Sequence, residues 1–166
     1  HVAVGGQHAH WRDYRARPGR ARMWARWHAV MPAITLARGH FPGRRLGWLE
    51  DLPRGVALDW ARSRRDFTAS ARTAAGRDEL RRRLAAFTAD ALIVAPVDDD
   101  FGTGAALDRA DAYSPGRRTV RWRVRPEELG VAEIGHFGLF HARFAPTFWP
   151  ATLEWLRDGV APAAAR

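Results

Sequence analysis

Apolar side chains form one unbroken run in this chain and recur periodically in most of the rest. The run at residues 91–97 has the length of a strand that is buried on both faces of a parallel sheet. Residues 118–124 alternate between polar and apolar, which predicts a strand with one wetter face, and residues 2–5 are a short strand candidate that ends on glycine. These three segments are expected to form the sheet.

Apolar side chains spaced by three and four residues predict the helices. The predicted helices cover residues 20–37, 78–87, 104–113 and 144–156. Pro32 is expected to kink the first of them or end its first segment, because proline lacks the amide donor that a helix interior needs. Asp51-Leu52-Pro53 predicts another helix start, with Asp51 as cap and Pro53 in the first turn. Strands and helices alternate around a helical insertion, so the predicted fold class is α/β.

The composition fits one ordinary folded domain. With 166 residues, 46% of them hydrophobic and 11% aromatic, the chain is long enough to build a core. No apolar run reaches membrane-spanning length and no signal-peptide pattern opens the chain, so a cytoplasmic protein with no membrane partner is expected. The absence of cysteine excludes disulfides and thiolate metal sites. Because the sequence opens on His1 and runs directly into a strand-like segment, we expect it to be cut from a longer protein.

Arginine alone supplies the basic charge, because the chain contains no lysine, and the net charge is +9. Guanidinium groups pair bidentately with phosphates and stack on bases, so an Arg- and Trp-rich nucleic-acid-binding module is one candidate function. The arginines are spread over most of the chain without an RNP-like motif or zinc-finger spacing, a distribution typical of a solvated exterior. The codon bias of a GC-rich genome explains the same composition.

Two segments carry candidate chemistry. Ile134-Gly135-His136-Phe137-Gly138 places a histidine between glycines, which let the backbone turn sharply and leave the imidazole available for proton transfer. Upstream, Asp98-Asp99-Asp100 follows the buried strand, and α/β sheets place ligand and catalytic groups at the carboxyl ends of their strands. One helix and one strand fit between the two segments, so an aspartate is expected to meet His136 above the sheet. Otherwise the aspartates cap a helix or solvate a turn.

Several stretches in order resemble the carboxyl-terminal part of predicted bacterial α/β-hydrolases related to the serine aminopeptidase-like hydrolases. The matching stretches are residues 6–14, 41–47, 51–61, 134–138, 148–150 and 154–156. Together they cover nearly the whole chain, and their order and spacing are more specific than Gly-His-Phe alone. The resemblance implies a partial α/β-hydrolase fold, with the last strands of a mostly parallel sheet and a helical cap insertion. It divides the chain into a late strand and active-site loop (1–10), the cap (11–90), the carboxyl-terminal part of the core (91–160) and a tail (161–166).

The resemblance further implies a Ser-Asp-His site for acyl transfer on a small-molecule ester or amide, with no cofactor. His136 matches the family's histidine. The family's acid stands second in an Asp-Asp-Pro-aromatic sequence, where this chain has Asp98-Asp99-Asp100-Phe101, so Asp99 is favoured and Asp98 is the other candidate. Trp24, Trp27 and Phe137 are candidates for lining an acyl pocket, although the tryptophan spacing fits ordinary helix packing equally well.

The nucleophile of such a site is missing. Ser63, Ser70 and Ser114 are the only serines; none lies in Gly-x-Ser-x-Gly, and Ser114 follows the acid although the family order is Ser, acid, His. Val4-Gly5-Gly6-Gln7 resembles the tail of such an elbow, but Ala3 would then stand near the serine position. We therefore expect the elbow to lie upstream and this chain alone to be inactive. His8 and His10 have no third ligand nearby in sequence, and no metal site is expected.

Overall fold

A computed structural model of the chain describes residues 1–166 except 9, 15–18, 49 and 166. The chain divides into two compact units. The sheet unit comprises His1–Ala9 and Ala71–Arg166, and the helical unit comprises His10–Ser70. Strands and helices are mixed and the main sheet is parallel, which confirms the predicted α/β class. Among the described residues, no helix has both the length and the apolar character to cross a membrane.

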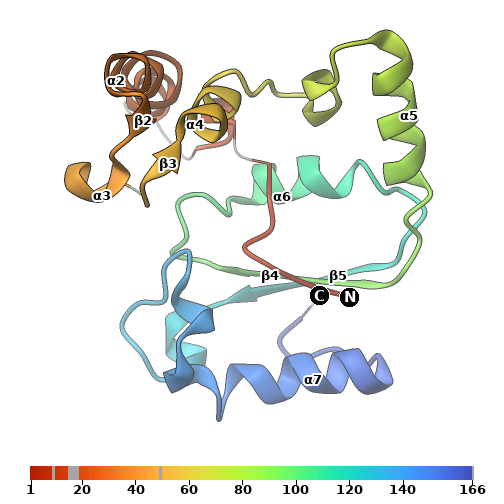
Figure 1. Cartoon of the computed structure of the whole chain (residues 1–166). Helices are drawn as coiled ribbons and strands as arrows, with labels where there is room; N and C mark the ends of the chain where they lie inside the picture. The colour runs from red at the N-terminus through yellow and green to blue at the C-terminus, as the bar shows by residue number, and fades with distance from the viewer. Residues whose placement is uncertain (9, 15–18, 49, 166) are drawn as a thin grey trace. The chain divides into compact units, whose positions relative to one another are not determined.

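The main sheet contains the three predicted strands in the order β1-β4-β5 (Figure 1). These are β1 (Val2–Val4), β4 (Ala91–Pro96) and β5 (Thr119–Val124). Both pairings are parallel, with Val2 opposite Leu92 and Leu92 opposite Val120. Every residue of β4 is buried, as its continuous apolar run predicts for a central strand covered on both faces.

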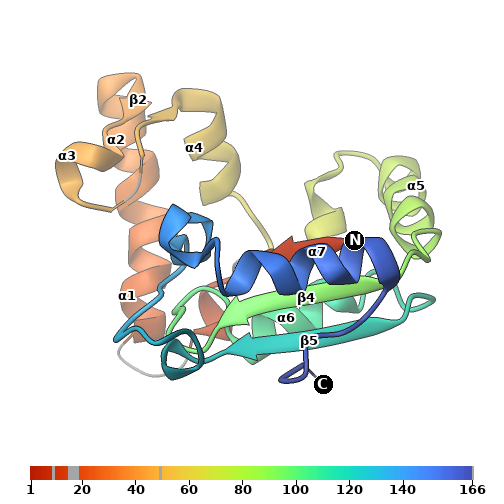
Figure 2. The same ribbon diagram turned by 90° about the horizontal axis from the view of Figure 1, so that it is seen from below.

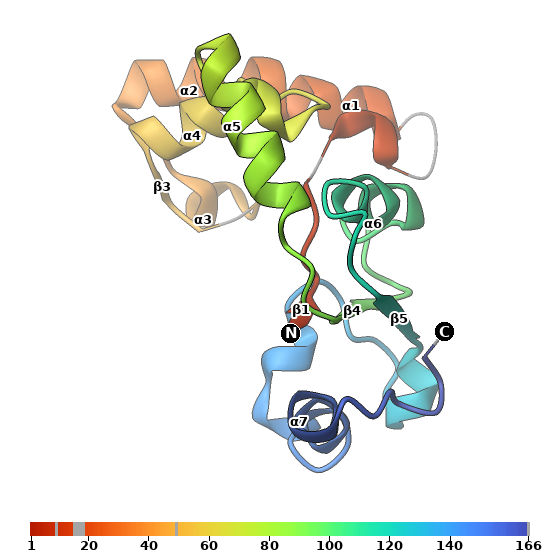
Figure 3. The ribbon, with the colours of Figure 1, turned by 90° about the vertical axis from the view of Figure 1, so that its right-hand side faces the viewer.

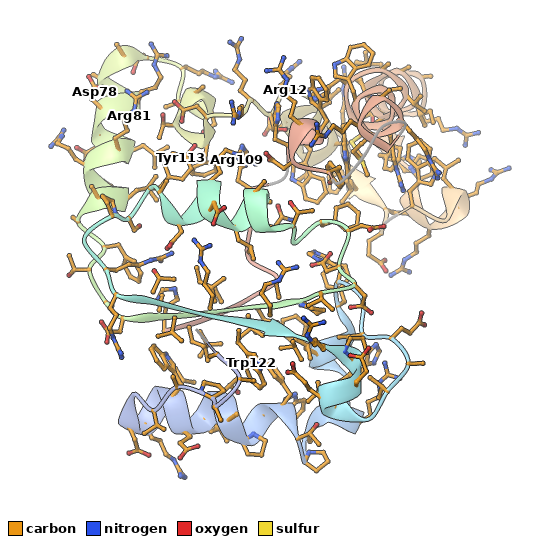
Figure 4. The ribbon with its side chains drawn as sticks, turned by 180° about the vertical axis from the view of Figure 1, so that it is seen from behind. Arg12, Asp78, Arg81, Arg109, Tyr113 and Trp122 are labelled. Atoms are coloured by element: carbon orange, nitrogen blue, oxygen red, sulfur yellow. The ribbon has the colours of Figure 1, made fainter. Side chains whose placement is uncertain are left out.

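Helices cover both faces of this sheet, with α6 (Gly104–Asp111) on one side and α7 (Phe148–Asp158) on the other (Figures 2 and 3). Successive residues of β4 point to opposite faces. Leu92 and Val94 therefore belong to the core on the α7 side, while Ile93 packs with Leu107 of α6. Trp122 points from β5 toward α7 (Figure 4) and packs against the Phe148 ring, with the centroids 5.4 Å apart.

The helix starts of the sheet unit differ from the predictions at two places. Helix α5 (Ala74–Ala85) begins four residues before the predicted start, because the Thr73 side chain caps it by accepting from the Gly76 amide. Helix α7 begins at Phe148 and not at 144, since the chain before it forms two separate 3-10 turns, η5 (Gly138–Phe140) and η6 (Ala142–Phe144). A further 3-10 turn, η4 (Pro126–Leu129), follows β5.

The helical unit has its own small core of Met31, Phe41 and Ala57. Pro32 is expected to kink the helix predicted at residues 20–37 or end its first segment, and a π-helical segment precedes it: the helix runs as α1 (Gly19–Ala25), then η2 (Arg26–Val30), then α2 (Met31–Arg38), and the Met31 amide bonds to the Arg26 carbonyl. The predicted cap at Asp51 is wrong, since Pro53 is the N-cap of α4 and the Asp51 carboxylate accepts from the Arg44 amide instead. The elements of the unit are η1 (Trp11–Asp13), α1 (Gly19–Ala25), η2 (Arg26–Val30), α2 (Met31–Arg38), β2 (His40–Phe41), α3 (Gly43–Leu46), β3 (Leu52–Pro53), α4 (Arg54–Ala61) and η3 (Phe67–Ser70).

The predicted cap, residues 11–90, spans most of the helical unit together with α5, which belongs to the sheet unit. The predicted tail is partly packed, because Ala165 lies against the core on the α7 side.

Candidate active site

Three loops meet at the carboxyl ends of the parallel strands. Gly5 follows β1, Asp98 and Asp99 follow β4, and His136 lies on the long connection after β5. His136 Nδ1 lies 2.8 Å from Asp99 Oδ2. The Asp99 side chain is fully buried, whereas the His136 side chain is 24% exposed. The sequence-predicted pair is therefore in direct contact at the edge of the sheet where α/β proteins carry their sites.

The backbone that follows Asp99 holds its carboxylate. The Phe101 amide donates to Asp99 Oδ1 at 2.8 Å, and the Gly102 amide also bonds to the carboxylate. Burial alone would raise the pKa of Asp99, but the hydrogen bonds from His136, Phe101 and Gly102 outweigh it and hold the pKa below its ordinary value. Asp99 is thus an ionised, buried carboxylate with a fixed orientation.

Asp98 turns the other way and anchors the histidine loop. Its Oδ2 accepts from the Ile134 amide at 2.7 Å and from the Gly135 amide at 3.2 Å. Gly135 has φ +69°, a left-handed conformation that glycine adopts without steric cost. Of the two candidate acids, Asp99 contacts the imidazole and Asp98 contacts the backbone just before it.

The His136 imidazole has a defined orientation. Its ring contacts the rings of Phe101 and Phe137, at centroid distances of 5.2 and 4.5 Å. Gly5, with φ +62°, lies so close that a Cβ built on it would be 3.4 Å from His136 Cε1. An ionised carboxylate only accepts hydrogen bonds, so we assign the proton of the neutral ring to Nδ1. Nε2 then carries the lone pair, and among the described residues it has no hydrogen-bond partner. That is the state required of a general base.

Apolar surface adjoins the histidine. Phe137 is 67% exposed and Phe140 is 62% exposed. The other pocket candidates lie in the helical unit: Trp24 is half exposed on α1, and Trp27 packs against the Met31 core and the Trp60 ring. A shared acyl pocket therefore stays a prediction, and Trp27 has the ordinary packing role that its spacing also allowed.

The sheet unit contains one serine, Ser114, and it does not lie at this site. Ser114 precedes β5, and its hydroxyl donates to the Leu84 carbonyl at 2.8 Å. Since β4 and β5 are parallel and six residues long, Ser114 and Asp99 lie at opposite ends of the sheet, about 20 Å apart by strand rise. Ser63 and Ser70 belong to the helical unit. In the described part of the chain, no three His, Asp or Glu side chains are grouped to hold a metal ion.

Sequence reasoning missed two residues that support the pair. Gly102 approaches the carboxylate so closely that a Cβ would lie 2.5 Å from Asp99 Oδ2. Arg123 of β5 donates from Nη1 to the Gly102 carbonyl at 2.5 Å and so holds the same turn from the neighbouring strand. A glycine three residues after a candidate acid is the signal that points to a close approach of this kind. Nothing in the spacing of Arg123 points to its role.

Comparisons of the chain with protein-family models, with curated proteins and with solved structures give no match.

Proposed function

We propose that His136 and Asp99 are the base and the orienting acid of an acyl-transfer site of the α/β-hydrolase type, which acts on a small-molecule ester or amide. The observation that carries the proposal is the 2.8 Å contact between His136 Nδ1 and the buried, ionised Asp99, with Nε2 turned away from the acid. The parallel sheet with helices on both faces supports it, because the pair follows adjacent strands β4 and β5.

In this mechanism a serine hydroxyl attacks the substrate carbonyl and His136 Nε2 takes its proton. The same proton then passes to the alcohol or amine that leaves, and an acyl-enzyme remains. Water, deprotonated by His136, hydrolyses the acyl-enzyme and restores the serine. Asp99 fixes the imidazole tautomer and stabilises the imidazolium that forms in each half of the reaction.

We expect the serine and the oxyanion donors of this mechanism to lie outside these residues. Without them the covalent step and its main electrostatic stabilisation are lost, so the 166-residue chain alone is expected to turn over no ester.

The arginine contacts favour this function over nucleic-acid binding. Arg117, Arg118 and Arg121 all pair with aspartates of the sheet unit, and the shortest Arg117–Asp111 contact is 2.6 Å. On α5, Arg82 and Arg83 pair with Glu79. Guanidinium groups already paired with carboxylates contribute less to a phosphate-binding surface.

The test uses the protein translated from the whole open reading frame. We expect a Gly-x-Ser-x-Gly segment upstream, p-nitrophenyl ester turnover, its loss in His136→Ala, and a fall in kcat of about ten-thousand-fold in Asp99→Asn. Asp100→Asn is the matched control, because Asp100 is the exposed next residue, and it should leave the rate unchanged. Near-wild-type turnover in His136→Ala, or a reading frame without an elbow, contradicts the proposal.

A further inference from the structure

The long helix of the helical unit is apolar on its outer face as well as on its inner face. In this helix α1, η2 and α2 follow one another without a break (Figure 2). Met31 and Thr35 of α2 are buried, and Ile34 packs against the same small core. The exposed residues over positions 29–37 are nevertheless all apolar: Ala29, Val30, Ala33, Leu36 and Ala37. A helix that is apolar all round is normally covered on both sides, and the core of this unit covers only one.

Positive charge flanks this outer face. Residues 14–49 contain eight arginines and no aspartate or glutamate. Arg22 precedes the apolar stretch and Arg38 follows it, and both are exposed and have no ion pair among the described residues. The pKa of Arg26, which lies between them in sequence, is lowered, first by burial and then by the charge of Arg22. Like charges on this helix are therefore close enough to repel one another.

Almost all of the net charge of the chain belongs to the helical unit. Thirteen arginines and five acidic residues give His10–Ser70 a net charge of +8, out of +9 for the whole chain. In the sheet unit fourteen arginines are balanced by thirteen acidic residues. The arginines are thus spread along the sequence, but their excess over carboxylates is confined to the unit that carries the apolar helix face.

Two half-exposed tryptophans belong to the same unit. The ring centroid of Trp24 on α1 lies 6.2 Å from that of His28, and the ring of Trp60 on α4 lies 5.8 Å from that of Trp27. Tryptophan is enriched at the boundary between lipid headgroups and acyl chains, because its ring is apolar and its indole N–H is polar. The helical unit therefore combines exposed aliphatic, exposed aromatic and unneutralised basic side chains.

We propose that the outer face of η2 and α2 binds the surface of an anionic lipid bilayer. Val30 and Leu36 then lie at the boundary of the acyl chains, and Arg22 and Arg38 lie among the lipid phosphates. Binding of this kind needs no spanning segment, so the lack of such a helix in the described part of the chain does not bear on it. The proposal departs from the expectation of no membrane partner, which considered only spanning segments, and it does not depend on the hydrolase function.

The bilayer fits both properties of the surface, whereas two other partners fit one each. Nucleic acid matches the charge, but Val30 and Leu36 have no ring to stack on a base and no group to bind a phosphate. A second copy of the chain matches the apolar face, but two helical units of net charge +8 would repel each other. Anionic lipid offers acyl chains to the leucine and phosphates to the arginines.

Binding is tested by co-sedimentation of the purified chain with vesicles of phosphatidylglycerol and phosphatidylcholine in equal parts. We expect saturable binding at low salt, and much weaker binding to vesicles of phosphatidylcholine alone. Leu36→Asp should weaken binding about tenfold or more, because a carboxylate replaces a side chain that enters the apolar boundary. Leu156→Asp is the matched control: it changes the charge equally, and Leu156 of α7 has the same exposed fraction as Leu36, 58%.

The contribution of charge is measured in the same assay. Arg38→Gln should weaken binding about fivefold, the contribution usual for one arginine near an anionic surface. Arg157→Gln, an exposed arginine of α7, is its control and should bind like the wild type. Circular dichroism of all four variants should match the wild type, since each changed side chain is exposed.

Four results would overturn the proposal. The first is no binding to the mixed vesicles, and the second is equal weakening in Leu36→Asp and Leu156→Asp. The third is an oligonucleotide that the chain binds while it ignores the vesicles, which would assign the charge to nucleic acid. The fourth is a dimer, seen by light scattering, that Leu36→Asp dissociates, which would assign the apolar face to a second copy. Because none of these measurements requires ester turnover, failure here is distinct from failure of the proposed hydrolase function.

Discussion

Gly102 limits how the backbone can approach the candidate acid. Any side chain there begins with a Cβ 2.5 Å from Asp99 Oδ2 and 3.2 Å from its Cγ, distances that require the turn or the carboxylate to move. Glycine is required here because the backbone approaches the carboxylate closely, and not because of its φ angle, since Gly102 is not among the glycines with positive φ.

Gly102→Ala is therefore expected to lower the free energy of unfolding by about 1–3 kcal/mol, the usual range for overpacking, and to displace Asp99 from His136. Gly104→Ala is the matched control, since a Cβ on Gly104, the first residue of α6, meets nothing within 4 Å. Urea denaturation of the two variants measures the difference. Equal stability of both would contradict the close approach at Gly102.

The sequence could predict that an aspartate after β4 meets His136, but not fully which one. Asp98 and Asp99 stand on the same turn, and the direction of each carboxylate depends on backbone angles that the residue types do not fix. The family resemblance favoured Asp99, and the geometry gives Asp99 the imidazole and Asp98 the Ile134 and Gly135 amides.

Among the elements, the histidine loop depends on a single carboxylate for its start. Asp98 Oδ2 receives both loop amides, and Gly135 then turns the chain so that His136 faces Asp99. Without this carboxylate the loop keeps its hydrogen bond at Leu139, whose carbonyl accepts from Trp149 Nε1. The backbone at Ile134 and Gly135, where the loop begins, loses the hydrogen bonds that hold it.

Asp98→Ala should consequently increase hydrogen exchange at the Ile134 and Gly135 amides by about tenfold, because each loses a charge-assisted hydrogen bond. Asp100→Ala, on the same turn and exposed, serves as control and should leave exchange unchanged. The measurement is amide exchange followed by NMR. Unchanged protection of both amides in Asp98→Ala would show that other contacts hold the loop.

Strands were predicted better than helix ends. A continuous apolar run such as that of β4 is stable in water only as a strand buried on both faces, and every residue of β4 is buried as predicted. Helix ends depend on local competition for hydrogen bonds: Thr73 caps α5 four residues before the predicted start at residue 78, and Asp51 bonds to Arg44 instead of capping α4. The presence of these helices was predictable from periodicity, whereas their caps required the actual partners.

Across the whole molecule, two partly or fully buried carboxylates, Asp99 and Asp111, are expected to make the sheet unit sensitive to acid. Burial would raise the pKa of Asp111, but hydrogen bonds from Arg117, Thr119 and Arg121 outweigh it, so its pKa, like that of Asp99, is lowered. Folding therefore lowers the pKa of both groups, and their stabilisation is complete above the unfolded-state value, about 4.

As the pH falls from about 4 toward the lower folded-state pKa values, the folded chain should lose this stabilisation progressively. The double variant Asp99→Asn/Asp111→Asn should be less stable at neutral pH and show a flatter dependence of stability on pH below about 4. The dependence of stability on pH is measured from the midpoints of urea unfolding, followed by circular dichroism across this range, with Asp100→Asn as control. A double variant with the wild-type slope would assign the acid sensitivity to other carboxylates.

The contacts of His1 and β1 have a kinetic consequence. Val2 pairs with Leu92, and the His1 carbonyl accepts from the Leu92 amide and, 154 residues away in the sequence, from Trp155 Nε1. During synthesis β1 emerges long before either partner, while the helical unit between them can form its local contacts first. The sheet that carries His136 and Asp99 is thus assembled late, and until α7 has been made the apolar face of β4 is open to aggregation.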